Sequence, residues 1–407
     1  MNANIAGLIV KPFDQPVSEV TLRVDGPQGI LQKEFNGNFE FTNLRIGDDY
    51  KVTALVDKNY LDGVSTMDIV KIQRHILGTE TFPSPWHLLA ADVNGDHRVT
   101  AADIAAVRKL ILGVDGKYKS NLSWMFLDAN YQFPDPNDPW IENLPSEYNI
   151  ISLAGPMMYA DFRGIKVGDV SQTTWNGLHK TESRSLKNME LELGEPINKH
   201  LVPVFAKEAM TLSGMQFTLK FNPSQLNITG IKSGKIALLD PNIGWTYIDK
   251  SYILVSWNAD QDVSVSKGDL LFFIETDQDL DNQLVTSIEI NSDVINAEAY
   301  SEQDEILGIH LNSGESNLKE DIVIGEPVPN PFAQLTTLKF YLKERTEIQY
   351  SISDLNGKLI YRKKEGYQEG QNTLTIRKEI LSGPGVYLLK IEAGEYTKSI
   401  KLVLFDN

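Results

Sequence analysis

One twelve-residue run of the chain has the side chains and the spacing to bind a hard metal ion. It reads DVNGDHRVTAAD and occupies positions 92–103. Oxygen-bearing side chains stand at its positions 1, 3, 5, 9 and 12, and a main-chain carbonyl is available at position 7. The candidate ligands are therefore Asp92, Asn94, Asp96, Arg98 (through its carbonyl), Thr100 and Asp103. A loop with this spacing wraps around one cation with about six to eight oxygen ligands, and Ca²⁺ is the expected ion. Because the three carboxylates repel one another, we expect the ion to contribute to the stability of the fold.

The alternative interpretation of this run is a polar turn that only caps the following helix. A weaker copy upstream, at positions 57–68, favours the metal site instead. Its candidate ligands are Asp57, Asn59, Asp62, Gly63 (through its carbonyl), Ser65 and Asp68. Leu61 takes position 5, where a ligand is expected, and Asp62 has moved to position 6. The first loop therefore either loses one side-chain ligand or recruits Asp62 or water. The sequence predicts one calcium ion and leaves a second one open.

A helix is expected directly after each loop. Apolar residues at helical spacing predict helices over 65–77 and 100–112. Ser or Thr stands at each start and Gly at each end, which are normal start and stop residues. The two segments repeat at an offset of 35 residues (103 − 68). The identical pairs are Val64/Val99, Asp68/Asp103, Ile69/Ile104, Ile76/Ile111, Leu77/Leu112 and Gly78/Gly113.

Paired calcium loops, each followed by a helix that ends in Ile-Leu-Gly, resemble a type I dockerin over residues 57–115. The amino-acid sequence of the repeats is similar to that of the dockerin variant in exported Bacteroidetes proteins. The resemblance implies calcium binding and a protein partner, which is contacted at loop positions 10 and 11 and along the following helix. In this sequence those residues are Thr66, Met67, Gln73, Arg74, Ala101, Ala102, Arg108 and Lys109. Ordinary helix surface is the alternative interpretation of each of them.

The segments on either side of the repeats predict β structure. Residues 1–56 read as short alternating strands, with Asn36-Gly37 as a type I′ hairpin turn. This stretch resembles the carboxypeptidase-regulatory-like β-sandwich, a spacer in exported proteins. Residues 116–185 are rich in aromatic residues, Asp and Pro, and we expect them to form an extension packed on the dockerin-like module.

Residues 186–318 show strands in a sandwich rhythm. The runs LVPVFA (201–206), SGMQFTLKFNPSQL (213–226) and GDLLFF (268–273) are similar to a cohesin-like β-sandwich, the fold of dockerin receptors. A sandwich with a generic adhesive or spacer role is the alternative. The presence of both modules suggests that the dockerin-like part docks on the cohesin-like part, within one chain or between neighbours.

Residues 321–407 carry a signal for localisation. The runs PNPF (329–332), SDLNGK (353–358), GVYLLKI (385–391) and KSIKLV (398–403) resemble the C-terminal sorting domain of the type IX secretion system. The pattern departs at Ser353, where an aromatic residue is usual. The resemblance implies an Ig-like sandwich, contact with the secretion machinery, and a secreted or surface-attached protein; an ordinary terminal Ig-like domain is the alternative. Asn356-Gly357 is expected to form a hairpin turn.

Composition excludes several classes of protein. The formal charge is −17 (38 Lys and Arg against 55 Asp and Glu), so non-specific binding to nucleic acid or to anionic membranes is not expected. The chain has no Cys, which excludes disulfides and thiolate metal sites. No stretch is apolar over the roughly 18 residues that a membrane-spanning helix needs. The first residues do not read as a signal peptide, so the protein is either cytosolic or a fragment or mature form, and its C-terminus favours the second.

The sequence as a whole predicts a mainly β, multidomain protein with a small helical module. We find no G-x-S-x-G, H-E-x-x-H, Walker or Rossmann pattern, and only six His residues are present. The expected function is that of a non-catalytic, calcium-stabilised modular protein that mediates dockerin/cohesin-type or adhesive contacts outside the cell. The alternative is the accessory and sorting region of a larger exported hydrolase.

Overall fold

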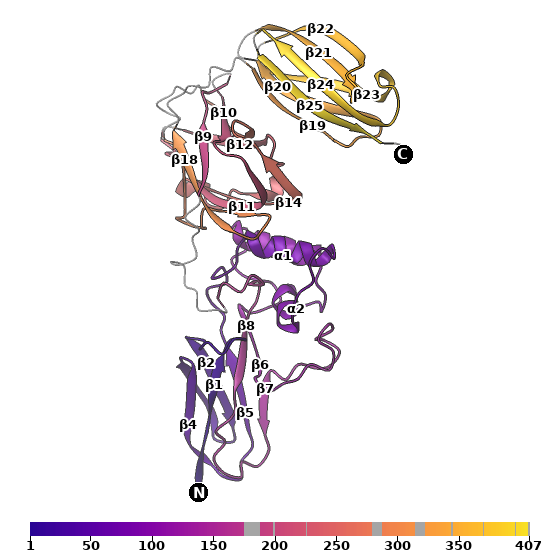
Figure 1. Cartoon of the computed structure of the whole chain (residues 1–407). Helices are drawn as coiled ribbons and strands as arrows, with labels where there is room; N and C mark the ends of the chain where they lie inside the picture. Colours follow the sequence, from indigo (N-terminus) through magenta and orange to yellow (C-terminus); the bar gives the residue numbers. More distant parts are fainter. Residues whose placement is uncertain are drawn as a thin grey trace.

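The computed structural model describes residues 1–174, 188–197, 200–224, 226–278, 287–313, 322–342, 345–368, 370–394 and 396–405. This part of the chain is mainly β and contains three α-helices. An N-terminal sandwich, a helical module, a central sandwich and a C-terminal sandwich follow one another along the molecule (Figure 1). The expected boundaries at 185/186 and 318/321 lie outside the described residues.

The N-terminal sandwich contains eight strands in two sheets. The first sheet has the order β4-β1-β8-β6 and the second the order β3-β2-β5-β7. The strands are β1 (Asn2–Val10), β2 (Val20–Gly26), β3 (Gly29–Phe35), β4 (Asn38–Arg45), β5 (Tyr50–Leu55), β6 (Trp124–Asp128), β7 (Glu147–Ile150) and β8 (Phe162–Lys166). The helical module is therefore inserted between β5 and β6 of one sandwich.

The described part of the segment 116–185, residues 116–174, does more than we expected from its composition. It packs on the helical module through residues such as Tyr118 and Val167. It also supplies β6, β7 and β8 to the N-terminal sandwich, so this sandwich does not end at residue 56. The physical reason is strand pairing: β8 pairs with β1 and β7 with β5, which covers two edges that the first 56 residues would leave open.

Asn36-Gly37 does not form the two-residue hairpin that we predicted. β3 pairs with β2 in one sheet and β4 pairs with β1 in the other, so the dipeptide connects two sheets. Gly37 has a φ of +77°, but Asn36 is not among the residues with positive φ, as a type I′ turn requires. The Asn36 side chain instead accepts a hydrogen bond from the Glu19 N–H.

Two of the helices begin and end within one residue of the predicted ranges 65–77 and 100–112. The helices are α1 (Thr66–Ile76), α2 (Pro85–Ala91) and α3 (Ala101–Ile111), of which α2 was not predicted. Ser65 and Thr100 form capping boxes with Asp68 and Asp103. At the end of α1, the Gly78 N–H donates to the His75 carbonyl and the Thr79 N–H to the Arg74 carbonyl, and α3 ends in the same pattern. These paired caps give both repeats the same local structure.

The central sandwich is built from one continuous path of strands in the order β12-β15-β10-β9-β18-β17-β11-β14-β13, with β16 beside β11. β9 and β18, which are the first and last of these strands in the sequence, pair in parallel. The strands are β9 (Asn188–Leu193), β10 (Leu201–Ala206), β11 (Met210–Lys220), β12 (Ile228–Ser233), β13 (Ile243–Gly244), β14 (Tyr252–Val265), β15 (Leu270–Thr276), β16 (Glu289–Asn291), β17 (Glu298–Ser301) and β18 (Ile306–Ser313). Side chains from these strands pack together in one hydrophobic core.

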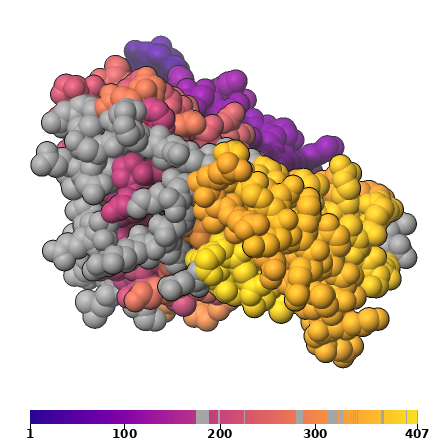
Figure 2. All heavy atoms as spheres, turned by 90° about the horizontal axis from the view of Figure 1, so that it is seen from above, coloured from indigo at the N-terminus to yellow at the C-terminus, as the bar shows by residue number. Residues whose placement is uncertain are grey.

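The C-terminal sandwich has two sheets, β19-β20-β23 and β22-β21-β24-β25, around a core of its own. Figure 2 shows it at one end of the molecule. The strands are β19 (Ile322–Val328), β20 (Leu335–Leu342), β21 (Thr346–Asp354), β22 (Leu359–Tyr367), β23 (Gly370–Arg377), β24 (Gly385–Ala393) and β25 (Tyr396–Leu404). The predicted hairpin at Asn356-Gly357 is confirmed, since β21 and β22 are antiparallel and Gly357 has a φ of +82°. In the described part of the chain, no helix combines the length and the apolar character needed to cross a membrane.

Candidate metal centre and docking face

The second loop is wound around the carboxylate of Asp92. Asp92 Oδ1 accepts hydrogen bonds from the N–H groups of Gly95 (2.9 Å) and Asp96 (3.0 Å), and Oδ2 accepts from the His97 N–H (2.9 Å). The bend places Gly95 and His97 in the left-handed region, with φ values of +72° and +66°. Position 6 of such loops is usually Gly, and here His97 adopts the required conformation. The loop therefore has a curled main chain with an acidic side chain at its centre.

Hydrogen bonds of the other candidate ligands connect the second loop to α3. The Asp103 Oδ1 accepts from the Asn94 N–H (3.2 Å), and its Oδ2 accepts from the Thr100 N–H (2.8 Å). Asn94 Nδ2 donates to Asp96 Oδ2 (3.1 Å). The Thr100 hydroxyl accepts from the Ala102 N–H and so serves as the helix cap. The side chain of Arg98 is exposed, as expected if only its carbonyl is used.

The electrostatics of this loop favour a cation. Burial raises the pKa of Asp92 and of Asp103, and the Asp96 carboxylate raises both further. In the described part of the chain, no three Asp, Glu or His side chains gather closely enough to hold a metal ion by themselves. The amide oxygen of Asn94 and main-chain carbonyls must therefore complete the set. Carboxylate, amide and carbonyl oxygens together are the ligands that Ca²⁺ takes, so the residues fit this ion.

Asn121 supports the second loop, and sequence reasoning missed it. Its Nδ2 donates to the Asp92 carbonyl (2.7 Å), and its own carbonyl accepts from the Tyr60 hydroxyl (3.5 Å). Asn121 lies on the segment after α3, outside the repeat, so no spacing rule points to it. Trp140, from the same connecting segment, stacks on His97 with ring centroids 6.0 Å apart.

The first loop uses its candidate ligands for contacts within the protein. Asp57 is exposed and accepts from the Tyr60 hydroxyl, while the Asn59 carbonyl accepts from Lys166 Nζ (2.6 Å). The Gly63 carbonyl accepts from the Thr173 hydroxyl (2.8 Å). Ser65 caps α1 through its hydroxyl. One of these donors, Lys166, is the last residue of β8, and another, Thr173, lies in the segment that follows.

Lys166 and Asp169 bring opposite charges to the first loop. Lys166 is fully buried; burial lowers its pKa to about 8, while Asp62 and Asp169 act in the opposite direction. Asp68 is also buried, and its Oδ1 accepts from the Ser171 N–H (2.7 Å). Burial raises the pKa of Asp68, and the neighbouring Asp169 carboxylate raises it further. The Lys166 ammonium thus lies on the main-chain carbonyl of Asn59 and beside the charges of Asp62 and Asp169.

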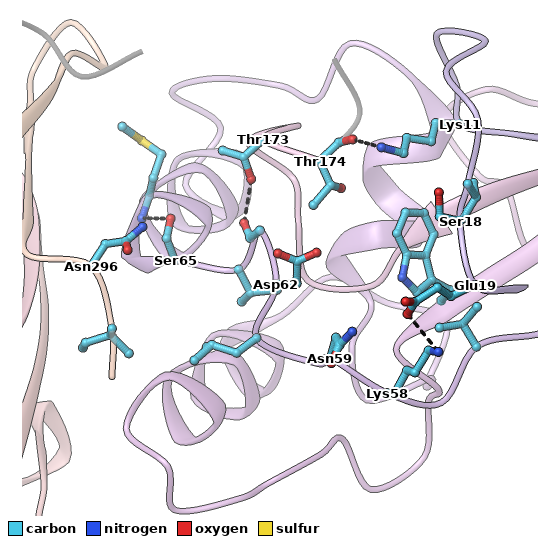
Figure 3. Close-up of a pocket in the computed structure, with 18 of the residues that line it drawn as sticks. Lys11, Ser18, Glu19, Lys58, Asn59, Asp62, Ser65, Thr173, Thr174 and Asn296 are labelled. Carbon is cyan, nitrogen blue, oxygen red and sulfur yellow. Dashed lines mark hydrogen bonds and ion pairs between the residues drawn. The ribbon is translucent and has the colours of Figure 1, made fainter. Parts of the chain in front are cut away.

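A pocket of about 660 Å³ lies beside the first loop (Figure 3). Asn59 and Asp62 line it from the loop, and Thr173 and Thr174 line it from the segment after β8. Lys11 reaches in from the N-terminal sandwich and donates to the Thr174 carbonyl (2.5 Å). Asp62 thus faces a space shared by several modules rather than a ring of loop oxygens.

α1 lies across the outward side of β11, β14 and β17, which we call the docking face (Figure 1). Thr66 donates its N–H to Gln216 Oε1 (2.7 Å), and its hydroxyl is 2.6 Å from the Ser256 hydroxyl. Met67 and Val70 pack against Tyr300. The helical module and the central sandwich are therefore joined by direct side-chain contacts.

Charged and amide groups surround this apolar contact. Lys71 Nζ and Arg74 Nη1 bind the two carboxylate oxygens of Asp304, at 2.6 Å and 2.7 Å. Arg74 Nη2 also donates to the Ser213 hydroxyl (3.1 Å). Asn258 lies between the repeats, since it accepts from Arg108 of α3 and donates to Gln73 of α1. Both repeats therefore contribute to the docking face.

Comparison with protein families identifies two of the modules. Residues 57–112 match the type I dockerin domain, and residues 328–404 match the secretion system C-terminal sorting domain. The chain contains a type I dockerin domain and a type IX sorting domain. Type I dockerin domains bind calcium in general, and the sorting domain marks a secreted or cell-surface protein. The comparison with curated proteins finds no match.

Solved structures give only weak likenesses. Dimeric latent PorU from Porphyromonas gingivalis is 8% identical with a TM-score of 0.25, over 100% of this chain and 33% of that one. The Bacillus anthracis TIE protein is 8% identical with a TM-score of 0.21, over 100% and 48%. BcpA, the major pilin subunit of Bacillus cereus, is 9% identical with a TM-score of 0.20, over 99% and 95%. The chain thus spans about a third of PorU and about half of the TIE protein, and these scores support no functional argument.

The residues expected at the dockerin partner surface fall into two groups. Thr66, Met67, Gln73, Arg74 and Arg108 contact the central sandwich. The remaining three, Ala101, Ala102 and Lys109, are exposed. The first repeat of the dockerin domain is therefore covered over its contact positions, whereas the second repeat is covered at Arg108 and open at the other three.

Proposed function

We propose that this chain is a non-catalytic, calcium-stabilised modular protein that works outside the cell, where its dockerin domain makes a protein–protein contact. The observation that carries this proposal is the second loop, in which the main chain curls around Asp92 and Asp103 joins the curl to α3. The sorting domain supports export through the type IX machinery, and the dockerin domain implies a partner with a cohesin-type fold. The central sandwich, with its closing parallel pair of β9 and β18, is our candidate for a module of that type.

We propose a single resident calcium ion, held by the second loop. Asp92, Asn94, Asp96 and Asp103 would provide side-chain oxygens, and Arg98 a carbonyl. In the first loop, the Lys166 ammonium takes over the role of the cation, since it binds the Asn59 carbonyl and faces the charges of Asp62 and Asp169. A buried ammonium and a divalent ion in the same loop would repel each other. The ion itself would neutralise the second loop and hold it in one conformation.

The buried charged groups near the dockerin domain support a structural role rather than catalysis. Asp169 accepts hydrogen bonds from the N–H and hydroxyl groups of Thr173 and Thr174, so its carboxylate is held by several donors. His87 is buried between Ser84 and Gln172, and burial lowers its pKa to about 4. A carboxylate and an imidazole fixed in this way hold elements together, whereas a catalytic group needs access to a substrate.

Calorimetric titration of the full-length protein with Ca²⁺ tests this proposal. We expect one ion per chain, because the first loop already has the Lys166 ammonium beside it, whereas the second loop has no such cation among the described residues. Asp96→Asn is expected to weaken binding by about tenfold or more, since the affinity of such loops follows the charge of their ligands. Asp62→Asn is the matched control, because Asp62 is an equally exposed carboxylate at the next position of the first loop, and it should leave the isotherm unchanged. Two ions per chain, or an equal effect of both substitutions, would contradict the proposal.

A further inference from the structure

The docking face combines buried polar and apolar side chains. In β11 and β14, alternate side chains enter the central core, among them Phe217, Leu219 and Val255. Between them stand Gln216, which is 3% exposed, and Ser256, which is fully buried. Leu254 of β14 is fully buried and belongs to the same hydrophobic cluster as Ile69 and Ile72 of α1. The contact is therefore apolar as well as polar.

The buried polar groups of this face find their partners on α1. Gln216 Oε1 accepts from the Thr66 N–H, and the Ser256 hydroxyl meets the Thr66 hydroxyl. The Thr66 N–H belongs to the first turn of α1, where the main-chain donors have no partner within the helix. Burying polar groups without hydrogen bonds costs free energy. Here each of these buried groups has its hydrogen-bond partner on the opposite surface. The contact thus has the specificity of a recognition interface.

Charge complementarity points to the same pairing. α1 supplies the cations Lys71 and Arg74, and the turn between β17 and β18 supplies Asp304. Arg108 of α3 adds a third cation beside Asn258, and Asp260 of β14 accepts from Gln73 (3.2 Å). Cations on the helices and carboxylates on the sandwich disfavour a chance contact, because wrong partners would bring like charges together.

The two repeats differ at the positions that make the contact. Val64/Val99, Asp68/Asp103 and Ile69/Ile104 are identical in the two repeats, but Thr66 corresponds to Ala101, Met67 to Ala102 and Lys71 to Ala106. Ala101 and Ala102 are exposed. A dockerin domain turned so that α3 replaced α1 would lose the Thr66 hydroxyl contact and the Lys71 ion pair. The sequence of the first repeat therefore matches the docking face, and that of the second does not.

We propose that the partner of this dockerin domain is the central sandwich of its own chain, bound through the first repeat, so that α1 is withheld from other proteins. This inference rests on the proposed function of the dockerin domain as a protein-contact module, and it names the partner. The docked pair lies between the N-terminal and C-terminal sandwiches (Figure 1). Release of α1 would be required before another cohesin-type protein could use the same surface.

Because the natural chain has no Cys, a pair of introduced thiols tests the proposal in the full-length protein. Thr66→Cys/Ser256→Cys places the thiols where two hydroxyl oxygens are 2.6 Å apart. We expect this variant to form a disulfide within the monomer at least about tenfold faster than Ala101→Cys/Ser256→Cys, since the effective concentration of a docked pair is high. The control places its first thiol at the same loop position of the other repeat. Each variant should still bind one calcium ion, which shows that it is folded.

The docking would be overturned by faster closure of the Ala101→Cys pair, by equal rates for the two pairs, or by disulfides only between chains. Repeating the reaction with a chelator separates this proposal from the calcium proposal. Slower closure of the Thr66→Cys pair without calcium supports both. Closure at an unchanged rate leaves the docking intact and contradicts the stabilising role of the ion. Absence of closure in a variant that binds one ion contradicts the docking and leaves the proposed function intact.

Discussion

Chelation of calcium is expected to lower the free energy of unfolding of the dockerin domain by about 3–4 kcal/mol. This is the stabilisation that a ligand gives when it is present at about 100 to 1,000 times its dissociation constant and binds only the folded state. The physical reason is the second loop, in which Asp92, Asp96 and Asp103 interact with one another unfavourably without a cation. Differential scanning calorimetry of the full-length protein in Ca²⁺ and in EDTA measures the effect.

The C-terminal sandwich provides the internal control for this experiment. It has a hydrophobic core of its own, separate from the core of the dockerin domain. Its transition is therefore expected at the same temperature in both buffers, while the transition of the dockerin region moves down. The Asp96→Asn variant should already melt early and respond little to EDTA. An equal shift of all transitions, or no shift of any, would contradict a specific calcium site.

Lys166→Met is expected to destabilise the protein by about 3–5 kcal/mol, the usual cost of removing one partner from a buried charge cluster. The Met side chain fills similar space but removes the cation that faces Asp62 and Asp169, and the Asp169 carboxylate stays buried. It also leaves the Asn59 carbonyl without the donor that the first loop uses. Denaturant unfolding of the full-length protein at saturating Ca²⁺ measures the loss.

Lys58→Met is the matched control for this substitution. Lys58 is also a lysine near the first loop, but it pairs with Glu19 and Glu34 at the surface, at 2.9 Å and 3.4 Å. Exposed ion pairs of this kind contribute little, so its removal should barely change the midpoint of unfolding. Equal losses for the two variants would show that Lys166 does not act as the cation of the first loop.

The sequence predicts the dockerin domain closely because its signals are local. Ligand spacing, the caps at Ser65 and Thr100, and the glycines at 78 and 113 each depend on a few neighbouring residues. Family comparison confirms this domain and the sorting domain. The dockerin resemblance also pointed to Thr66 and Arg74, which prove to be contact residues.

What the sequence does not reveal depends on pairing between distant segments. β8 pairs with β1 although the whole helical module lies between them in the sequence, and no local pattern predicts this pairing. The same strand brings Lys166 to the Asn59 carbonyl of the first loop, so the sequence shows the missing ligand at Leu61 but not this neighbouring cation. Asn36-Gly37 has the composition of a hairpin, yet β3 and β4 belong to different sheets. Tertiary pairing overrides the local turn preference there.

Long-wavelength anomalous diffraction from crystals of the full-length protein grown in Ca²⁺ tests the central claim most directly. The account predicts one calcium peak per chain, among the oxygens of Asp92, Asn94, Asp96 and Asp103. In the first loop, it predicts no peak and the Lys166 ammonium on the Asn59 carbonyl. A calcium peak in the first loop, or none in the second, would contradict it.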